Sequence, residues 1–233
     1  MGNVTIEKSN SLYWLGRYIE RVFTTMDVYE DLFDEMLDGD DQCYHKFLEY
    51  LDLEDNYNND AHFITSYLFD INNPDSLYAN LSRGYDNAIM LREEISSETL
   101  SFVQMAMNCF ITMEESDAPI MELQSVRDCI YAFWGSIDEN VDSELCRTII
   151  KCGKYAERVD LYFRLSFDQN LIDRSVSKLS NRLEMIERIY HIDGLADLDF
   201  LKKDKSVAHL DYLQQLRLLT SLFEVKYSET SKF

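Results

Sequence analysis

Apolar side chains recur every three or four positions along most of this chain, and that spacing places them on one face of an α-helix. The first such window begins at Asn10 or Ser11 and runs to about Leu37. Further windows predict helices at about residues 44–51, 61–69, 77–113 (divided near 95–98), 120–133, 143–170, 171–191 and 205–225. Strictly alternating runs, which are typical of strands, are almost absent. We therefore predict an all-α fold, a bundle of seven or eight helices.

Few residues interrupt this pattern. Pro74 and Pro119 are each predicted to separate two helices. Residues 135–141 are predicted to form a connector, and residues 38–60 an acidic loop that contains the short helix at 44–51. Seven glycines and two prolines in 233 residues supply too few turns for a β-sandwich or a barrel, which needs one about every 8–12 residues. Since 46% of the residues are apolar, we expect one folded domain over residues 1–233.

Negative charge dominates the composition. The chain has 22 Lys and Arg against 43 Asp and Glu, a net charge of −21. Residues 27–60 alone hold thirteen acidic residues and a single base, Lys46. Such a surface repels the phosphates of nucleic acids and of anionic membranes. Neither is therefore an expected partner.

We expect a cytoplasmic protein without a metal or a cofactor. The first residues lack the basic stretch followed by an apolar one that marks a secretory signal. No apolar run approaches the roughly 18 residues of a membrane span. The five cysteines are scattered without a C-x-x-C pair, which fits buried thiols in a reducing compartment, and the four histidines are not spaced with them as zinc ligands.

One short sequence occurs twice. Gly16–Val22 is GRYIERV, and Gly153–Val159, 137 residues later, is GKYAERV, so that five of seven positions are identical. A match that includes Gly, Tyr, Glu and Arg together predicts an internal pseudo-repeat. We expect the two helices that carry it to lie next to each other at the centre of the bundle, related by a pseudo-two-fold axis.

On a helical wheel, the polar residues of the first copy share an arc beside the apolar face; they are Tyr13, Arg17, Glu20 and Arg21. Gly16 lies at the border, where a small residue lets another helix approach closely. Because aromatic side chains fill the remaining side, this helix is expected in the middle of the bundle. Its guanidinium groups are then partly removed from water and need carboxylate or backbone partners.

Two interpretations of these charges remain open. In the first, each glutamate holds an arginine of the facing helix, and the ion pairs fix the register of the two helices. In the second, four arginines converge on a cleft that binds a carboxylate or a phosphate group; these are Arg17, Arg21, Arg92 and Arg158. The candidate residues for either role are Tyr13, Arg17, Glu20, Arg21, Asn87, Arg92, Glu157 and Arg158. Glu20 and Glu157 are also the candidates for a catalytic base.

These motifs resemble a known family. Ser11–Arg21 (SLYWLGRYIER) and Gly153–Arg158 (GKYAER) are similar to the paired Glu-Arg motifs of the bacterial alpha-E domain family. Between them, Asn73–Leu77 resembles its Asn-Pro-x-Ser segment, and Arg83–Glu98 resembles its helix Glu-Asn-Ala-Arg-x-x-Arg-Glu-x-Ile-Ser. Lys154 stands where the family pattern has an arginine. The resemblance covers about residues 11–165, without the last 60 residues, and implies an all-helical fold.

The resemblance also implies a function. Domains of this family are typically encoded beside, or fused to, circularly permuted ATP-grasp ligases and transglutaminase-like proteins, in systems that form or modify amide bonds on peptides. We expect a helical accessory domain that docks such a ligase or its peptide substrate. The alternative is a stand-alone acyl- or aminoacyl-transfer enzyme, in which Glu20 or Glu157 is the general base and arginines hold the carboxylate or acyl phosphate. The predicted helix at 205–225 packs in the core or pairs with a second copy, which leaves a homo-oligomer open.

Overall fold

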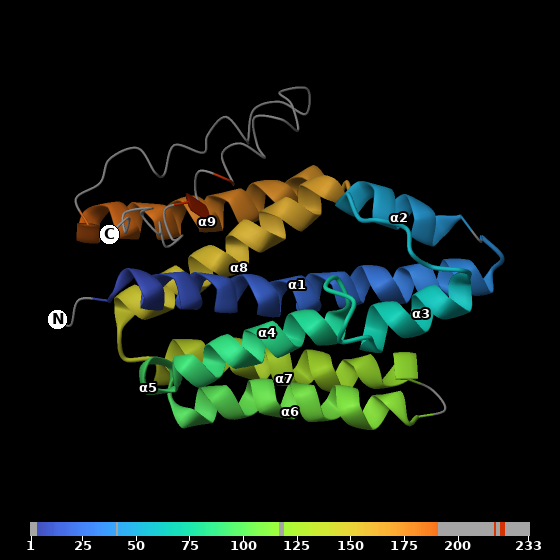
Figure 1. Ribbon diagram of the computed structural model, residues 1–233. Coiled ribbons are helices and arrows are strands. Elements are labelled where there is room, and N and C mark those ends of the chain that lie inside the picture. The colour runs from blue at the N-terminus through green and yellow to red at the C-terminus, as the bar shows by residue number, and fades with distance from the viewer. Residues whose placement is uncertain (1–3, 41, 117–118, 191–216, 218–219, 222–233) are drawn as a thin grey trace, which may run out of the picture.

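The computed structural model describes residues 4–40, 42–116, 119–190, 217, 220 and 221, and most of them are helical (Figure 1). The helices are α1 (Ile6–Leu37), α2 (Cys43–Leu51), α3 (Asp60–Phe69), α4 (Leu77–Met90), α5 (Arg92–Ile95), α6 (Ser97–Glu114), α7 (Pro119–Asn140), α8 (Glu144–Arg164) and α9 (Gln169–Tyr190). No strand occurs in these ranges, which confirms the predicted all-α fold. The count there is nine, because residues 77–113 form three helices.

Capping side chains set several boundaries. The hydroxyl of Thr5 accepts from the Lys8 N–H at 3.2 Å, so α1 begins before its predicted start. Ser143 caps α8, which begins at Glu144, one residue after the predicted start. Ser96, which has a φ of 72°, separates α5 from α6 and accepts from the Thr99 N–H. The predicted division near 95–98 is thereby confirmed.

Two predicted boundaries are wrong. α7 continues through the predicted connector at 135–141, because the single glycine there costs a helix only about 1 kcal/mol and Ile137 stays buried in the core. The predicted helix at 143–170 ends at Arg164, because Ser166 adopts the left-handed conformation with a φ of 56°.

Two expectations about the length of the folded unit are left as predictions. The helix predicted at 205–225 falls outside the described residues, except for residues 217, 220 and 221. A single domain over residues 1–233 likewise stays a prediction.

α1 lies in the middle of the bundle, in agreement with its apolar and aromatic surroundings. It packs against α8 and α4, and it also contacts α7 and α2 (Figure 1). α9 packs against α8, and the pair α6–α7 lies beyond α4. Several core side chains of α1 are at most 1% exposed; they include Leu12, Leu15, Ile19, Val22 and Met26. None of the helices described here is long and apolar enough to cross a membrane.

α1 and α8 run in the same direction and touch through two glycines (Figure 1). A Cβ atom on Gly16 would lie 2.0 Å from the carbonyl oxygen of Ile150, and one on Gly153 would lie 2.0 Å from that of Tyr13. The 137-residue offset of the repeated sequence relates Gly16 to Gly153 and Tyr13 to Ile150, so the two segments make equivalent contacts with each other. The backbones therefore meet where any side chain would separate them. The internal pseudo-repeat and the pseudo-two-fold axis stay predictions.

We predict that Gly153→Ala lowers the free energy of unfolding by about 3 kcal/mol, because the added methyl group would overlap the backbone of Tyr13. Urea denaturation followed by circular dichroism measures the change. Gly135→Ala on α7 is the matched control: nothing lies within 4 Å of its Cβ position, so a gain of up to about 1 kcal/mol is expected. If Gly153→Ala unfolded at the same urea concentration as the unsubstituted protein, the close contact would be contradicted.

Candidate functional site between α1 and α8

Glu157 of α8 is fully buried between two arginines of α1. Arg17 Nε donates to its Oε2 and Arg21 Nε to its Oε1, each at 2.5 Å. The two arginines are four residues apart, so they lie one turn apart on the same face of α1. Arg17 also lies 3.5 Å from Asp160 through its second terminal nitrogen. One carboxylate thus holds two cations, and one of these cations reaches a second carboxylate.

Glu20 of α1 is the equivalent of Glu157 and is equally buried. Its Oε1 accepts from Arg158 Nε and, at 3.2 Å, from the Thr24 hydroxyl. Its Oε2 has no hydrogen-bond partner among the described residues. The helices therefore exchange ion pairs reciprocally, as the first interpretation of the sequence predicts, but the second pair is less complete than the first.

The difference between the two halves follows from one residue. Lys154 occupies the position that corresponds to Arg17, and its ammonium lies 3.9 Å from the centroid of the Trp134 ring. In the part of the chain that is described, Lys154 forms no ion pair with Glu20. A lysine carries a single charged nitrogen, whereas the guanidinium fork can reach two carboxylates at once. Oε2 of Glu20 consequently lacks the donor that Arg17 gives to Glu157.

The two glutamates differ in acidity. Burial raises the pKa of Glu20, and Arg158 does not offset it, so this pKa lies above its ordinary value. Burial acts on Glu157 too, but two guanidinium groups together outweigh it, so the pKa of Glu157 lies below its ordinary value. Burial, reinforced by nearby cations, lowers the pKa of Lys154 to about 8.

Tyr13 and Thr220 cover the guanidinium group of Arg17. The Tyr13 hydroxyl lies 3.2 Å from Thr220 Oγ1, which also accepts from Arg17 Nη1 at 3.3 Å. The Trp14 ring lies against the same group, 4.9 Å from ring centroid to guanidinium carbon. The sequence predicts Tyr13 as a member of this cluster, whereas no sequence pattern indicates Thr220.

Arg92 and Asn87 do not join the cluster. The apolar positions Leu91 and Ile95 turn into the core, which leaves Arg92 exposed on α5. Asn87 lines a separate hollow of about 330 Å³ between α1 and α4. The predicted convergence of four arginines is therefore wrong: Arg92 lies outside, and the other three meet at the two glutamates.

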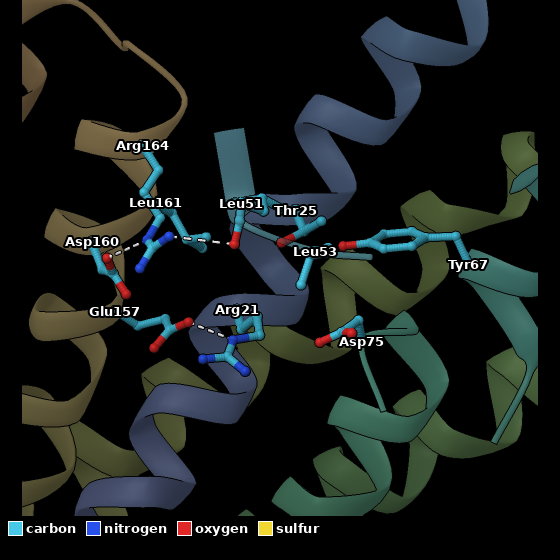
Figure 2. A pocket seen from close by; sticks show the side chains of 10 residues that line it. All are labelled: Arg21, Thr25, Leu51, Leu53, Tyr67, Asp75, Glu157, Asp160, Leu161 and Arg164. Carbon is cyan, nitrogen blue, oxygen red and sulfur yellow. Dashed lines mark hydrogen bonds and ion pairs between the residues drawn. The ribbon is translucent and has the colours of Figure 1, made fainter. Parts of the chain in front are cut away.

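A cavity of about 140 Å³ lies beside Arg21 (Figure 2). Its walls come from α1, α3, α8, the end of α2 and the segments before α3 and α4. The lining residues are Arg21, Thr25, Leu51, Leu53, Tyr67, Asp75, Glu157, Asp160, Leu161 and Arg164. Within the described ranges, no three His, Cys, Asp or Glu side chains are grouped so that they could hold a metal ion. The polar groups that the cavity presents are suited to binding a small charged molecule.

The sequence indicates only part of this lining. Arg21 and Glu157 are predicted site residues, and the remaining polar ones are missed; these are Thr25, Tyr67, Asp75, Asp160 and Arg164. Helical spacing is a usable signal for some, since Thr25 follows Arg21 by four positions and Asp160 follows Glu157 by three. Asp75 falls within the block that resembles the Asn-Pro-x-Ser segment. Tyr67 carries no signal, because aromatic residues on a helix most often pack in a core.

We predict that exchanging the two non-equivalent cations shifts stability in opposite directions. Lys154→Arg should raise the free energy of unfolding by about 1 kcal/mol, because a guanidinium group can reach Oε2 of Glu20. Arg17→Lys should lower it by about 2 kcal/mol, because Glu157 loses a charge-assisted hydrogen bond in a buried position. Urea titration measures both variants. A loss of stability in Lys154→Arg as large as that in Arg17→Lys would refute the proposed correspondence.

Comparison with known proteins agrees with this geometry. The family model Alpha-E, described as a predicted alpha-helical domain with a conserved ER motif, matches residues 8–198. The match contains both Glu-Arg segments and reaches beyond residues 11–165, so part of the last 60 residues belongs to it. No curated protein and no solved structure matches the chain. Because the matched region is well over half of the 233 residues, this chain belongs to the Alpha-E family.

Proposed function

We propose that this chain is a helical binding domain in a bacterial amide-bond-forming peptide-modification system. Its partner is a circularly permuted ATP-grasp ligase or the peptide substrate of that ligase. The observation that carries the proposal is a groove of about 450 Å³ between α1, α2 and the connection from α8 to α9. A groove of this size accommodates a few side chains of a partner segment.

The groove combines an apolar floor with an acidic rim. Its apolar residues include Val28, Leu32, Phe47, Leu165 and Phe167. Its rim carries three carboxylates, from Asp31, Glu35 and Asp40, against one base, Lys46. An amphipathic segment with apolar and basic side chains is complementary to such a surface.

Further exposed carboxylates lie on the elements that form the groove and on the segment that follows α2. They lie on the second half of α1, on α2 and on the segment after α2, and include Asp34, Asp38, Glu49, Asp52, Glu54 and Asp55. Their summed field attracts a basic partner and accelerates its association at low ionic strength. In this proposal, the acidic excess of the chain is a docking surface for a ligase or a leader peptide with basic residues.

The buried ion pairs have a different role in this proposal. Glu20 and Glu157 bind the arginines of the opposite helix, so they fix the register of α1 and α8 rather than contact a partner. Arg21 and Glu157 belong to this network and also line the cavity of Figure 2. We include in the proposal that this cavity binds a carboxylate or phosphate group.

We predict that reversing the charge of the groove weakens the complex with a circularly permuted ATP-grasp ligase by about tenfold or more. The double variant Asp31→Lys, Glu35→Lys replaces two rim carboxylates. Its matched control, Glu114→Lys with Glu115→Lys at the end of α6, makes the same change in net charge on exposed residues away from the groove. Titration calorimetry with the purified ligase, and separately with its peptide substrate, measures both variants.

Two results would contradict this docking surface. One is a chain that elutes alone from size-exclusion chromatography in the presence of the ligase and of the peptide. The other is an equal loss of affinity in the groove variant and in the control variant, because that would trace the effect to net charge alone.

A stand-alone acyl- or aminoacyl-transfer enzyme is the second candidate, and one observation favours it. Oε2 of Glu20 has no partner in the described ranges, and burial raises the pKa of this carboxyl group, which are properties of a general base in a desolvated site. Access to Glu20 is blocked by complete burial, however, so a substrate must open the α1–α8 contact.

We expect no turnover when the purified chain is incubated with an amino acid p-nitrophenyl ester and an acceptor amine. Release of p-nitrophenol is followed by absorbance. Suppose instead that the chain shows turnover, that Glu20→Gln abolishes it without changing the urea midpoint, and that Glu98→Gln retains it. That result would support the enzymatic function and contradict the docking proposal. Glu98 is an exposed residue of α6 and serves as the matched control.

A further inference from the structure

The cavity beside α1 has a cationic and an anionic side. Arg21 reaches it from α1, and Asp75 reaches it from the segment before α4, on the opposite side in Figure 2. Leu51, Leu53 and Leu161 add an apolar wall. A ligand in this space meets both signs of charge and a short hydrophobic surface.

Two carboxylates of the lining are already neutralised. Both oxygens of Glu157 accept from Arg17 and Arg21. Asp160 accepts from Arg164 Nε at 2.8 Å, and its other oxygen lies 3.5 Å from Arg17. These groups therefore frame the cavity but offer a ligand little free charge.

The carboxylate of Asp75 remains for a ligand. Among the described residues it makes neither a hydrogen bond nor an ion pair, while its backbone is fixed: the Asn73 side chain accepts from the Asp75 N–H at 3.0 Å. Ser76, the next residue, caps α4 by accepting from the Ala79 N–H at 3.0 Å. The hydroxyl group of Tyr67 points into the cavity from the same side in Figure 2. This carboxylate and this hydroxyl oxygen are both acceptors, and together they suit an ammonium group.

The opposite side consists of donors. Arg21 gives its Nε to Glu157 and reaches Asn80 with Nη1 at 3.4 Å, which leaves Nη2 without a hydrogen-bond partner in the described ranges. Thr25, one turn further along α1, is 1% exposed, and its hydroxyl also has no partner in the described ranges. A buried hydroxyl is normally hydrogen-bonded. Its orientation toward the cavity in Figure 2 therefore indicates a group that binds there.

We propose that this cavity binds a small free α-amino acid as its zwitterion. The α-carboxylate accepts from Arg21 Nη2 and from the Thr25 hydroxyl, and the α-ammonium donates to Asp75 and to the Tyr67 oxygen. This inference rests on the proposed function, because it names the molecule whose carboxylate enters the cavity. It fits a system that forms amide bonds, since a free amino acid is a substrate of such a reaction.

Charge favours a zwitterion over a simple anion. The lining includes three carboxylates, from Asp75, Glu157 and Asp160, and two guanidinium groups, from Arg21 and Arg164. A phosphate or acetate ion would add negative charge beside the unpaired Asp75, whereas a zwitterion supplies one charge of each sign. Ion pairs in a partly dehydrated site are favourable only when each charge finds its counterpart.

The size of the cavity limits the side chain. About 140 Å³ is well below the roughly 300–1,000 Å³ of pockets that hold drug-sized ligands. A glycine, alanine or serine fits this volume, with its side chain against the leucine wall. A dipeptide does not.

Titration calorimetry of the purified full-length chain with L-alanine tests the proposal. L-alanine should bind, and both propionate, which lacks the ammonium, and L-alaninamide, which lacks the carboxylate, should bind about tenfold more weakly or worse. Acetate and inorganic phosphate are the further probes, and they should bind more weakly than L-alanine.

Two variants assign the ends of the ligand. Asp75→Asn should weaken L-alanine about tenfold, because the ammonium contact is lost. It should not weaken propionate, because that anion has no ammonium and is relieved of the repulsion from the Asp75 carboxylate. Asp86→Asn, an exposed residue of α4, is the matched control and should leave both unchanged. Thr25→Val should weaken L-alanine and propionate alike, since both retain the carboxylate. Circular dichroism confirms that each variant is folded.

The results separate this inference from the docking proposal. No heat of binding with millimolar L-alanine, or equal binding of L-alanine, acetate and phosphate, overturns the zwitterion site. If the ligase complex forms normally in the same preparation, the docking proposal stands. A chain that binds L-alanine with the expected order of analogues but forms no complex supports the amino-acid site and overturns only the docking groove.

Discussion

The direct contact of two parallel helix backbones is the constraint on which the rest of this structure depends. With a glycine on each side, α1 and α8 approach until the glutamate four residues further along each helix is sealed from water. Removing a lone carboxylate from water costs several kcal/mol, so each needs a cation at once. The arginine that follows each glutamate in the sequence forms an ion pair with the glutamate of the other helix and supplies this cation. The order of glycine, glutamate and arginine from Gly16 to Arg21 therefore follows from one physical requirement. The segment Gly153–Arg158 repeats the same order.

The two copies meet this requirement to different degrees: Glu157 is paired with two arginines, and Glu20 with one. Around Glu157, two guanidinium groups compensate burial, and the charged network continues through Asp160 and Arg164 to the polar cavity. Around Glu20, a lysine replaces one arginine and turns to an aromatic ring, so the network stops inside the protein. The two motifs are nearly identical in sequence, but their surroundings differ. The charged groups around Glu20 contact only other parts of the protein, whereas those around Glu157 also line the cavity. The asymmetry arises from side-chain reach and not from a different backbone.

The periodicity of apolar residues and the repeated motif predict which helices form and which of their faces are buried. They do not predict which residues the connections between helices bring together. The central position of α1 and the meeting of the two Glu-Arg segments follow from the wheel and the glycine, and both are confirmed. Arg92 has the same side chain as the other arginines, but the break between α4 and α5 at Leu91 places it on the surface. Helical periodicity does not predict this break. Tyr67 and Asp75 reach the cavity only because α3 and the turn before α4 fold back onto α1. α7 passes through Gly135 because burial of its neighbours outweighs a weak local preference.

Thr220, which lies outside the family match, accepts a hydrogen bond from Arg17 of the first motif. This residue lies beyond position 198, where the family match ends, yet its hydroxyl completes the surroundings of Arg17 and Tyr13. The outward-facing side of the paired motif is thus supplied by sequence that the shared helical unit does not include. A substitution at Thr220 can therefore change the polarity around this buried cation without altering the glycines and ion pairs that hold α1 against α8.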